Sequence, residues 1–90
     1  MGNYPRAREY YNRAACLSPH RAGPNLRLGI LAIQTGQWDP ARRAFEIACR
    51  IDPGCAEAYS GLAMIHQHHN NHAAAFEMYL RCLELDTDNL

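Results

Sequence analysis

The sequence contains no lysine: its nine basic residues are all arginine, and nine acidic residues balance them, so the formal net charge is zero. A chain without a cationic excess lacks the charge by which nucleic-acid-binding domains attract phosphates, so no nucleic-acid partner is expected. The sequence also lacks an apolar run of the roughly 18 residues that a membrane-spanning helix needs. Membrane insertion is therefore not expected either.

The sequence is also poor in features that would indicate secretion or a metal centre. The start, from Met1 to Arg6, has no apolar signal core, and the cysteines form no C-x-x-C pair and no regular framework (Cys16, Cys49, Cys55 and Cys82). Disulfide scaffolds and zinc ribbons depend on such patterns. The localisation stays open, with the cytoplasm favoured.

Motifs for catalysis are missing as well. The sequence has no glycine-rich phosphate loop, no nucleophile elbow and no H-E-x-x-H motif. Ser18 and Ser60 have no base at a spacing typical of an activated nucleophile. We therefore predict no catalytic residues, no cofactor and no enzymatic activity.

What the sequence does contain is a period of 34 residues. Ala7, Ala41 and Ala75 recur unchanged at this spacing. Other positions in the same register keep their chemical type: Gly2, Gly36 and Asn70; Tyr4, Trp38 and His72; Tyr11, Phe45 and Tyr79; Leu17, Ile51 and Leu85; Leu28 and Leu62; Gly29 and Ala63. A period of this length is typical of stacked helical units.

Each recurring residue type has a physical reason. The alanines and Gly29 fit where two helices approach closely, and the aromatic residue four positions after each alanine fills the larger gap on the same face. Gly36 and Asn70 tolerate the left-handed backbone that ends a helix. Asp39 is then expected to cap the next helix, with Pro40 as its first residue. The pattern predicts five helices joined by short links, over residues 4–17, 23–35, 39–51, 56–69 and 72–85.

The repeat resembles the tetratricopeptide repeat over essentially the whole chain. The resemblance implies an all-α fold, a right-handed α-solenoid of antiparallel helix pairs with about two and a half repeats. Within one continuous domain 1–90, we expect the second helix of a truncated repeat at 2–21 and full repeats at 22–55 and 56–89. Because both ends are cut in register with the repeat, a piece of a longer array is expected.

The sequence departs from the family pattern at a few positions. An aromatic residue is usual where Asn25 stands, and Tyr59 fits that pattern in the next repeat. The other departures are a missing aromatic at Ala32 and His66, and arginine in place of an aliphatic residue at Arg8 and Arg42. These changes are expected to soften the packing without altering the fold.

The resemblance implies a protein-interaction scaffold that binds a peptide or helix in a concave groove lined by the first helix of each pair. Family members that grip a terminal carboxylate use a Lys/Asn/Arg set there, whereas this sequence has no lysine and places Leu26, Ile30 and Met64 at those sites. An apolar partner segment is therefore predicted. The expected groove residues are Leu26, Arg27, Ile30, Ile33, Gln34, Ser60, Met64, Gln67 and His68; neighbouring repeats covering some of them is the competing interpretation.

Two alternatives stay open. The predicted last helix carries an apolar stripe with no capping helix after it: Phe76, Tyr79, Leu80 and Leu83. Residues 1–50 hold eight arginines and three acids, a net charge of +5, and residues 51–90 hold one arginine and six acids, a net charge of −5. Both features favour a self-association module that stacks copies head to tail. The other alternative is a regulatory segment of a larger enzyme or assembly.

The histidines near residue 70 are the remaining chemically suggestive group. His66, His68, His69 and His72 lie within seven residues, and two of them are four positions apart, a spacing that binds metal within one helix. The predicted helix break at Asn70 separates that pair. A polar turn with one half-buried histidine is therefore the favoured interpretation, and a metal site is the weak alternative.

Overall fold

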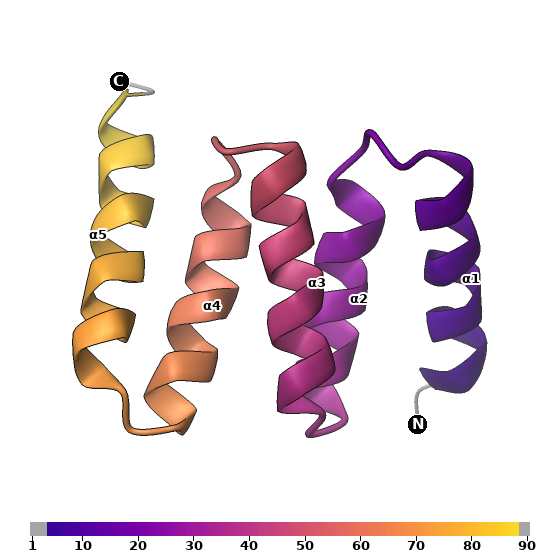
Figure 1. The fold of residues 1–90 in the computed structure, drawn as a ribbon, viewed down its shortest axis with the longest axis horizontal. Helices are drawn as coiled ribbons and strands as arrows, with labels where there is room; N and C mark the ends of the chain where they lie inside the picture. Colours follow the sequence, from indigo (N-terminus) through magenta and orange to yellow (C-terminus); the bar gives the residue numbers. More distant parts are fainter. Residues whose placement is uncertain (1–3, 89–90) are drawn as a thin grey trace.

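The computed structural model describes residues 4–88, so Gly2 and the predicted repeat end at residue 89 lie outside the described residues. The chain forms five helices, shown in Figure 1: α1 (Tyr4–Leu17), α2 (Gly23–Gln34), α3 (Trp38–Ile51), α4 (Ala56–His68) and α5 (His72–Asp88). Their ends agree with the predicted ends to within one residue, except that α5 continues three residues further.

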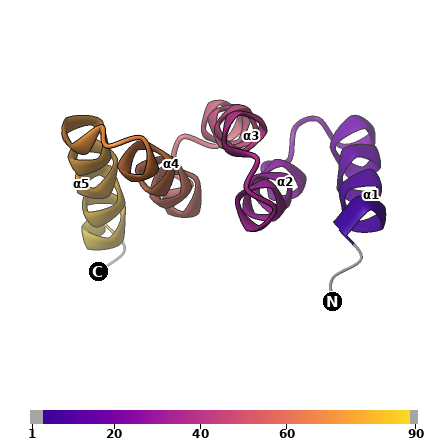
Figure 2. The ribbon, with the colours of Figure 1, turned by 90° about the horizontal axis from the view of Figure 1, so that it is seen from below.

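The helices stack in chain order, and no strand occurs among residues 4–88. Helices α2 and α3 form one antiparallel pair and α4 and α5 form another, while α1 packs on α2 (Figure 1). Seen along the helices, the chain zigzags, with α2 and α4 on one side of α3 (Figure 2). Helices α2 and α4 are also in contact. This arrangement confirms the predicted all-α solenoid.

Two matching turns reverse the chain within the helix pairs. Gly36 and Asn70 have φ angles of 73° and 61°, the left-handed conformation that the sequence predicts for them. After the first turn, the Gln37 N–H donates to the Ala32 carbonyl at 2.8 Å; after the second, the Asn71 N–H donates to the His66 carbonyl at 2.8 Å. These bonds satisfy carbonyls at the helix end, and the next helix starts directly afterwards.

The predicted cap of α3 is wrong by two positions. Gln37 precedes the first helical residue, Trp38, and it makes no side-chain cap hydrogen bond. The turn at Gly36 is complete at Gln37, so the helix begins before Asp39 is reached. Asp39 instead lies in the first turn, where its negative charge complements the helix dipole.

The core lies where α2, α3 and α4 meet. The recurring alanines Ala41 and Ala75 are buried, as predicted from the repeat. Phe45 is 2% exposed and is the largest fully buried side chain among the described residues. Ala48, Ala58, Leu62 and Ile65 complete its buried cluster with Ala41.

Two glycines make room for the Phe45 ring. A Cβ atom at Gly29 of α2 would lie 2.7 Å from the ring, and one at Gly61 of α4 would lie 2.5 Å from it. Both distances are too short for real contacts, so the ring fills the space of two absent side chains. The close approach at Gly29 was predicted; Gly61 was missed, because Arg27 stands 34 residues before it and gives no repeat signal.

Candidate functional site: two faces of helix α2

The first candidate site is the side-by-side surface of α2 and α4 that carries the predicted groove residues, here called the α2–α4 face. At its centre are Ile30 and Met64, which occupy the same position in successive repeats. They are 36% and 45% exposed. Arg27, Gln34 and Ser60 are the neighbouring polar residues, and the first two of these are exposed.

The apolar part of the α2–α4 face is narrower than the sequence predicts. Leu26 and Ile33 are half-buried and pack against the Phe45 cluster. The rotation of α2 that brings Gly29 against the Phe45 ring also turns these neighbours toward the core. Most of their apolar surface therefore contributes to folding, and Ile30 and Met64 supply the exposed apolar surface.

Two predicted groove residues form the border of the α2–α4 face. The Tyr79 hydroxyl of α5 donates a hydrogen bond of 3.2 Å to the Gln67 side-chain oxygen. The His68 ring stacks on Trp38 of α3, with ring centroids 3.8 Å apart and planes 14° apart. Both side chains are thereby held by the second helices of the pairs, and they fix the edges of the surface between them.

The histidines do not converge on a metal position. His68 stacks on Trp38, and the His69 ring lies edge-on to the His68 ring, with ring centroids 5.3 Å apart. The His69 Nδ1 atom lies 2.9 Å from the Ile65 carbonyl oxygen. The turn at Asn70 separates both rings from His72, which starts α5. Among the described residues, no group of three or more His, Cys, Asp or Glu is placed to hold a metal ion.

The Cys49 thiol is held in its protonated form. Within residues 4–88 no disulfide joins the cysteines. Burial, together with the nearby Cys55 and Cys82, raises the pKa of the Cys49 thiol to about 11. The nucleophilic form of cysteine is the thiolate, so Cys49 stays an unreactive thiol at neutral pH.

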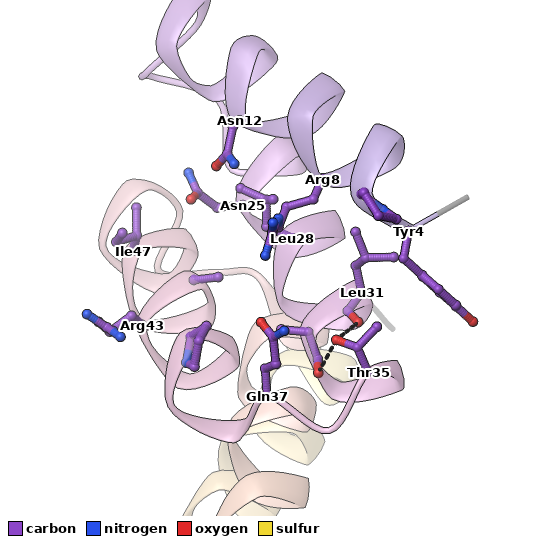
Figure 3. Close-up of a pocket in the computed structure, with 14 residues that line it drawn as sticks. Tyr4, Arg8, Asn12, Asn25, Leu28, Leu31, Thr35, Gln37, Arg43 and Ile47 are labelled. Atoms are coloured by element: carbon purple, nitrogen blue, oxygen red, sulfur yellow. Dashed lines mark hydrogen bonds between the residues drawn. The ribbon is translucent and has the colours of Figure 1, made fainter. Parts of the chain in front are cut away.

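The second candidate site is a pocket of about 560 Å³ on another side of α2, here called the α1–α3 pocket. Figure 3 shows it. Helices α1 and α3 each pack on α2 but, in the described structure, not on each other, so α2 forms the floor and the other two helices form the walls. The polar residues that line it are Tyr4, Arg8 and Asn12 of α1, Asn25 of α2, Thr35 and Gln37 of the turn, and Arg43 of α3.

The two candidate sites lie on nearly opposite faces of α2. With 3.6 residues per turn, Asn25, Leu28 and Ala32, which line the pocket, point away from Ile30. A ligand on one side therefore leaves the other side open.

The α1–α3 pocket was not predicted, although its signal was present in the sequence. Three of the departures from the family pattern, Arg8, Asn25 and Ala32, line this one pocket. A polar or small residue stands at two positions where an aromatic is usual, so the space that two rings would fill is hollow. One repeat later the same positions hold Arg42, Tyr59 and His66.

The outer face of α5 carries the predicted apolar stripe. Phe76, Tyr79, Leu80 and Leu83 are all exposed, and Phe76 most of all at 64%. Helix α5 packs on α4, and no other described helix contacts it. The four side chains thus lie on the surface, and their role in self-association stays a prediction.

These features define the class: an array of antiparallel helix pairs with a 34-residue period, in which a left-handed residue ends the first helix of each pair. A tetratricopeptide repeat model matches residues 1–65, and a second tetratricopeptide repeat model matches residues 55–85. The chain belongs to the tetratricopeptide repeat family.

The curated relatives are longer proteins. Human tetratricopeptide repeat protein 7B is 30% identical over 88 residues, 98% of this chain, and the mouse protein of the same name is 30% identical over 80 residues, 89% of it. The chain spans about a tenth of the length of these relatives, as each match covers 10% of the relative. The predicted division into repeats at 2–21, 22–55 and 56–89 stays a prediction.

Solved structures share the fold. A MamA structure superposes with a TM-score of 0.87 at 23% identity, covering 97% of this chain and 50% of MamA. The second repeat domain of RPAP3, bound to the HSP90 peptide SRMEEVD, superposes with a TM-score of 0.88 at 18% identity, covering 93% of this chain and 78% of that domain. A fold and family of this kind typically serve as non-enzymatic protein-interaction scaffolds.

No helix in the described part of this chain is long and apolar enough to cross a membrane.

Proposed function

We propose that this chain is a protein-interaction scaffold and that its α2–α4 face binds an apolar segment of a partner protein. The observation that carries the proposal is the exposure of Ile30 and Met64 at matching positions on two adjacent helices. Burying exposed apolar surface yields about 25 cal/mol per Å², so a partner residue placed between these two side chains gains free energy from both.

The lining of the α2–α4 face supports an apolar ligand over an acidic one. The RPAP3 domain is bound to a peptide with three acidic residues, SRMEEVD. On the α2–α4 face of this chain, Arg27 is the only lysine or arginine among the proposed residues. One exposed cation provides little binding energy, since isolated surface ion pairs contribute about 0–1 kcal/mol. Ile30 and Met64 therefore dominate the chemistry of this surface.

A peptide selection tests this proposal. A random peptide library displayed on phage is panned against the immobilised chain and, in parallel, against the Ile30→Glu, Met64→Glu chain. We expect the wild-type chain to enrich peptides with two or more large apolar residues at helical or alternating spacing. Equal enrichment of the same peptides by the double variant would contradict the proposal.

The apolar stripe on α5 favours self-association as a second candidate function. Its spacing of three and four residues puts Phe76, Tyr79 and Leu80 on one side of the helix, and all three are exposed. A second copy of the chain, or a following repeat, would cover this side. The acidic trailing half and basic leading half make a head-to-tail contact electrostatically complementary.

Sedimentation velocity tests the self-association. We expect the average mass of the chain to rise between about 10 μM and 1 mM, because a weak interface shifts its equilibrium with concentration. Phe76→Glu is expected to hold the chain monomeric over the same range. A wild-type chain that remains monomeric at the highest concentration would refute self-association and leave the α2–α4 proposal untouched.

A further inference from the structure

We propose that the α1–α3 pocket is a second binding site, which takes an acidic segment of a partner protein whose carboxylate is flanked by an apolar side chain. The site goes beyond the apolar α2–α4 face, because it lies on nearly the opposite side of α2 and has different chemistry. Its polar groups, its charge and its apolar floor each indicate one property of the ligand.

The amide of Asn25 indicates a polar ligand. Asn25 is the one buried polar residue of the described chain, at 8% exposure. Its side chain has no hydrogen-bond partner among residues 4–88, and the residue lines the pocket. No side-chain nitrogen or oxygen among the described residues is both buried and without a partner, so the amide atoms of Asn25 open toward solvent in the pocket. A ligand atom that accepts from the NH₂ group can form a hydrogen bond there. Figure 3 shows Asn25 on α2 facing Asn12 of α1 across the pocket.

The charge of the pocket indicates that this ligand atom is an anion. Arg8 of α1 and Arg43 of α3 line the two opposite walls, and no aspartate or glutamate lines the pocket. The one ion pair among the described residues, between Arg13 and Glu9, involves neither of them. Figure 3 shows Arg8 extending from α1 over Leu28 of α2. A guanidinium group binds a carboxylate through two parallel hydrogen bonds, which makes a carboxylate the matching ligand group.

The floor of the pocket indicates that the carboxylate is part of a larger, partly apolar molecule. Leu28 and Leu31 of α2 and Ile47 of α3 line the same space as the arginines. A volume of about 560 Å³ falls within the usual range of ligand pockets, about 300–1,000 Å³. An inorganic anion would contact the arginines and leave these apolar side chains exposed, whereas an acidic residue next to a leucine in a peptide contacts both.

The next repeat lacks the combination that makes this site. Tyr59 stands at the position of Asn25, with the Arg81 guanidinium 6.0 Å from its ring centre, and Arg42 stands at the position of Arg8. Arg42 is exposed and does not line the α1–α3 pocket. The chain therefore offers its own controls: Arg42 for the charge, and the tyrosine of the next repeat for filling the space.

Fluorescence anisotropy with a defined probe tests the proposal. The probe is the fluorescein-labelled, C-terminally amidated peptide Ser-Glu-Leu-Asp-Ser-Gly, and its control is Ser-Gln-Leu-Asn-Ser-Gly, labelled and amidated in the same way. Each has a single apolar residue, fewer than the two expected of a ligand for the α2–α4 face. We expect saturable binding of the acidic probe and binding of the control at least about tenfold weaker, because charge-assisted hydrogen bonds are lost. Arg8→Ala is expected to lower the affinity for the acidic probe about tenfold, and Arg42→Ala is expected to lower it less than about twofold.

A variant that fills the pocket shows whether the probe binds there or elsewhere on the surface. Asn25→Tyr, which places in this repeat the residue found at Tyr59, is expected to abolish probe binding while the helical circular dichroism is retained. Ile30→Ser with Met64→Ser is expected to leave probe binding intact, so failure of the α2–α4 proposal would not affect this test.

Three results would overturn the second site. They are a lack of saturation by the acidic probe, an equal loss of probe affinity in the Arg8→Ala and Arg42→Ala chains, or full probe binding by the Asn25→Tyr chain. Inorganic phosphate that displaces the probe at the probe's own affinity would overturn the assignment to a peptide segment.

Discussion

Replacing Phe45 with alanine is expected to lower the free energy of unfolding by about 3–5 kcal/mol, the usual loss for a fully buried phenylalanine. The ring is 2% exposed and sits against α2 and α4 at once, so its removal opens a cavity between three helices. A domain of this size is typically stable by only about 5–13 kcal/mol. Urea unfolding followed by circular dichroism measures the loss.

A second substitution, Gly61→Ala, tests the same contact from the α4 side. Alanine normally stabilises a helix by about 1 kcal/mol relative to glycine. Here the added Cβ would lie 2.5 Å from the Phe45 ring, and such overpacking costs about 1–3 kcal/mol, so the net effect is expected to be a loss. In the Phe45→Ala chain the clash is gone, and the same glycine replacement is expected to stabilise.

Gly61→Ala is thus expected to destabilise the wild-type chain and to stabilise the Phe45→Ala chain. This reversal distinguishes a close contact with the ring from ordinary helix propensity. Gly23→Ala serves as the control, because a Cβ atom there meets nothing within 4 Å. If the Phe45→Ala chain is too unstable to measure, Phe45→Leu removes the ring and keeps part of the apolar volume. A Gly61→Ala chain that is more stable than wild type would show that the ring does not occupy this space.

The second large effect is expected in binding. The double substitution Ile30→Glu, Met64→Glu is expected to lower the affinity for a peptide selected on the wild-type chain by at least about 100-fold, or about 2.7 kcal/mol of binding free energy. Both side chains are exposed, so the substitutions leave the core intact while placing two charges where the apolar ligand would lie. Anisotropy titrations give the affinities, and circular dichroism verifies the helix content.

Phe76→Glu is the matched control for this double variant. It also replaces an exposed apolar side chain with a charge, but on the outer face of α5. We expect it to change the affinity of the selected peptide less than about twofold. A larger loss in Phe76→Glu than in the double variant would move the binding site from the α2–α4 face to the α5 stripe.

The repeat made most of the fold predictable. Because Gly36 and Asn70 recur with the small residues Ala41 and Ala75 behind them, the turns and the close helix contacts could be placed before the structure was known. The contact of Gly61 with Phe45 could not, since it has no counterpart one repeat earlier. Contacts that occur once leave no periodic signal in a single sequence.

The candidate sites were only partly predictable, for a related reason. The period places Ile30 and Met64 on corresponding faces, but the rotation of α2 that turns Leu26 toward the core depends on the packing of three helices. The pocket depends on Asn25 and Arg8, which come from different helices and meet only when α1 packs on α2. Their departures from the repeat pattern were visible, whereas their proximity was not.

The central claim is that the α2–α4 face holds an apolar partner segment, and amide chemical-shift mapping tests it most directly. The ¹⁵N-labelled chain is titrated with the peptide selected on it, and the shifted amides are placed on the structure. The account predicts that the shifts concentrate on α2 and α4 around Ile30 and Met64, with the outer face of α5 unchanged. Shifts confined to α5 around Phe76, or spread evenly over all five helices, would contradict it.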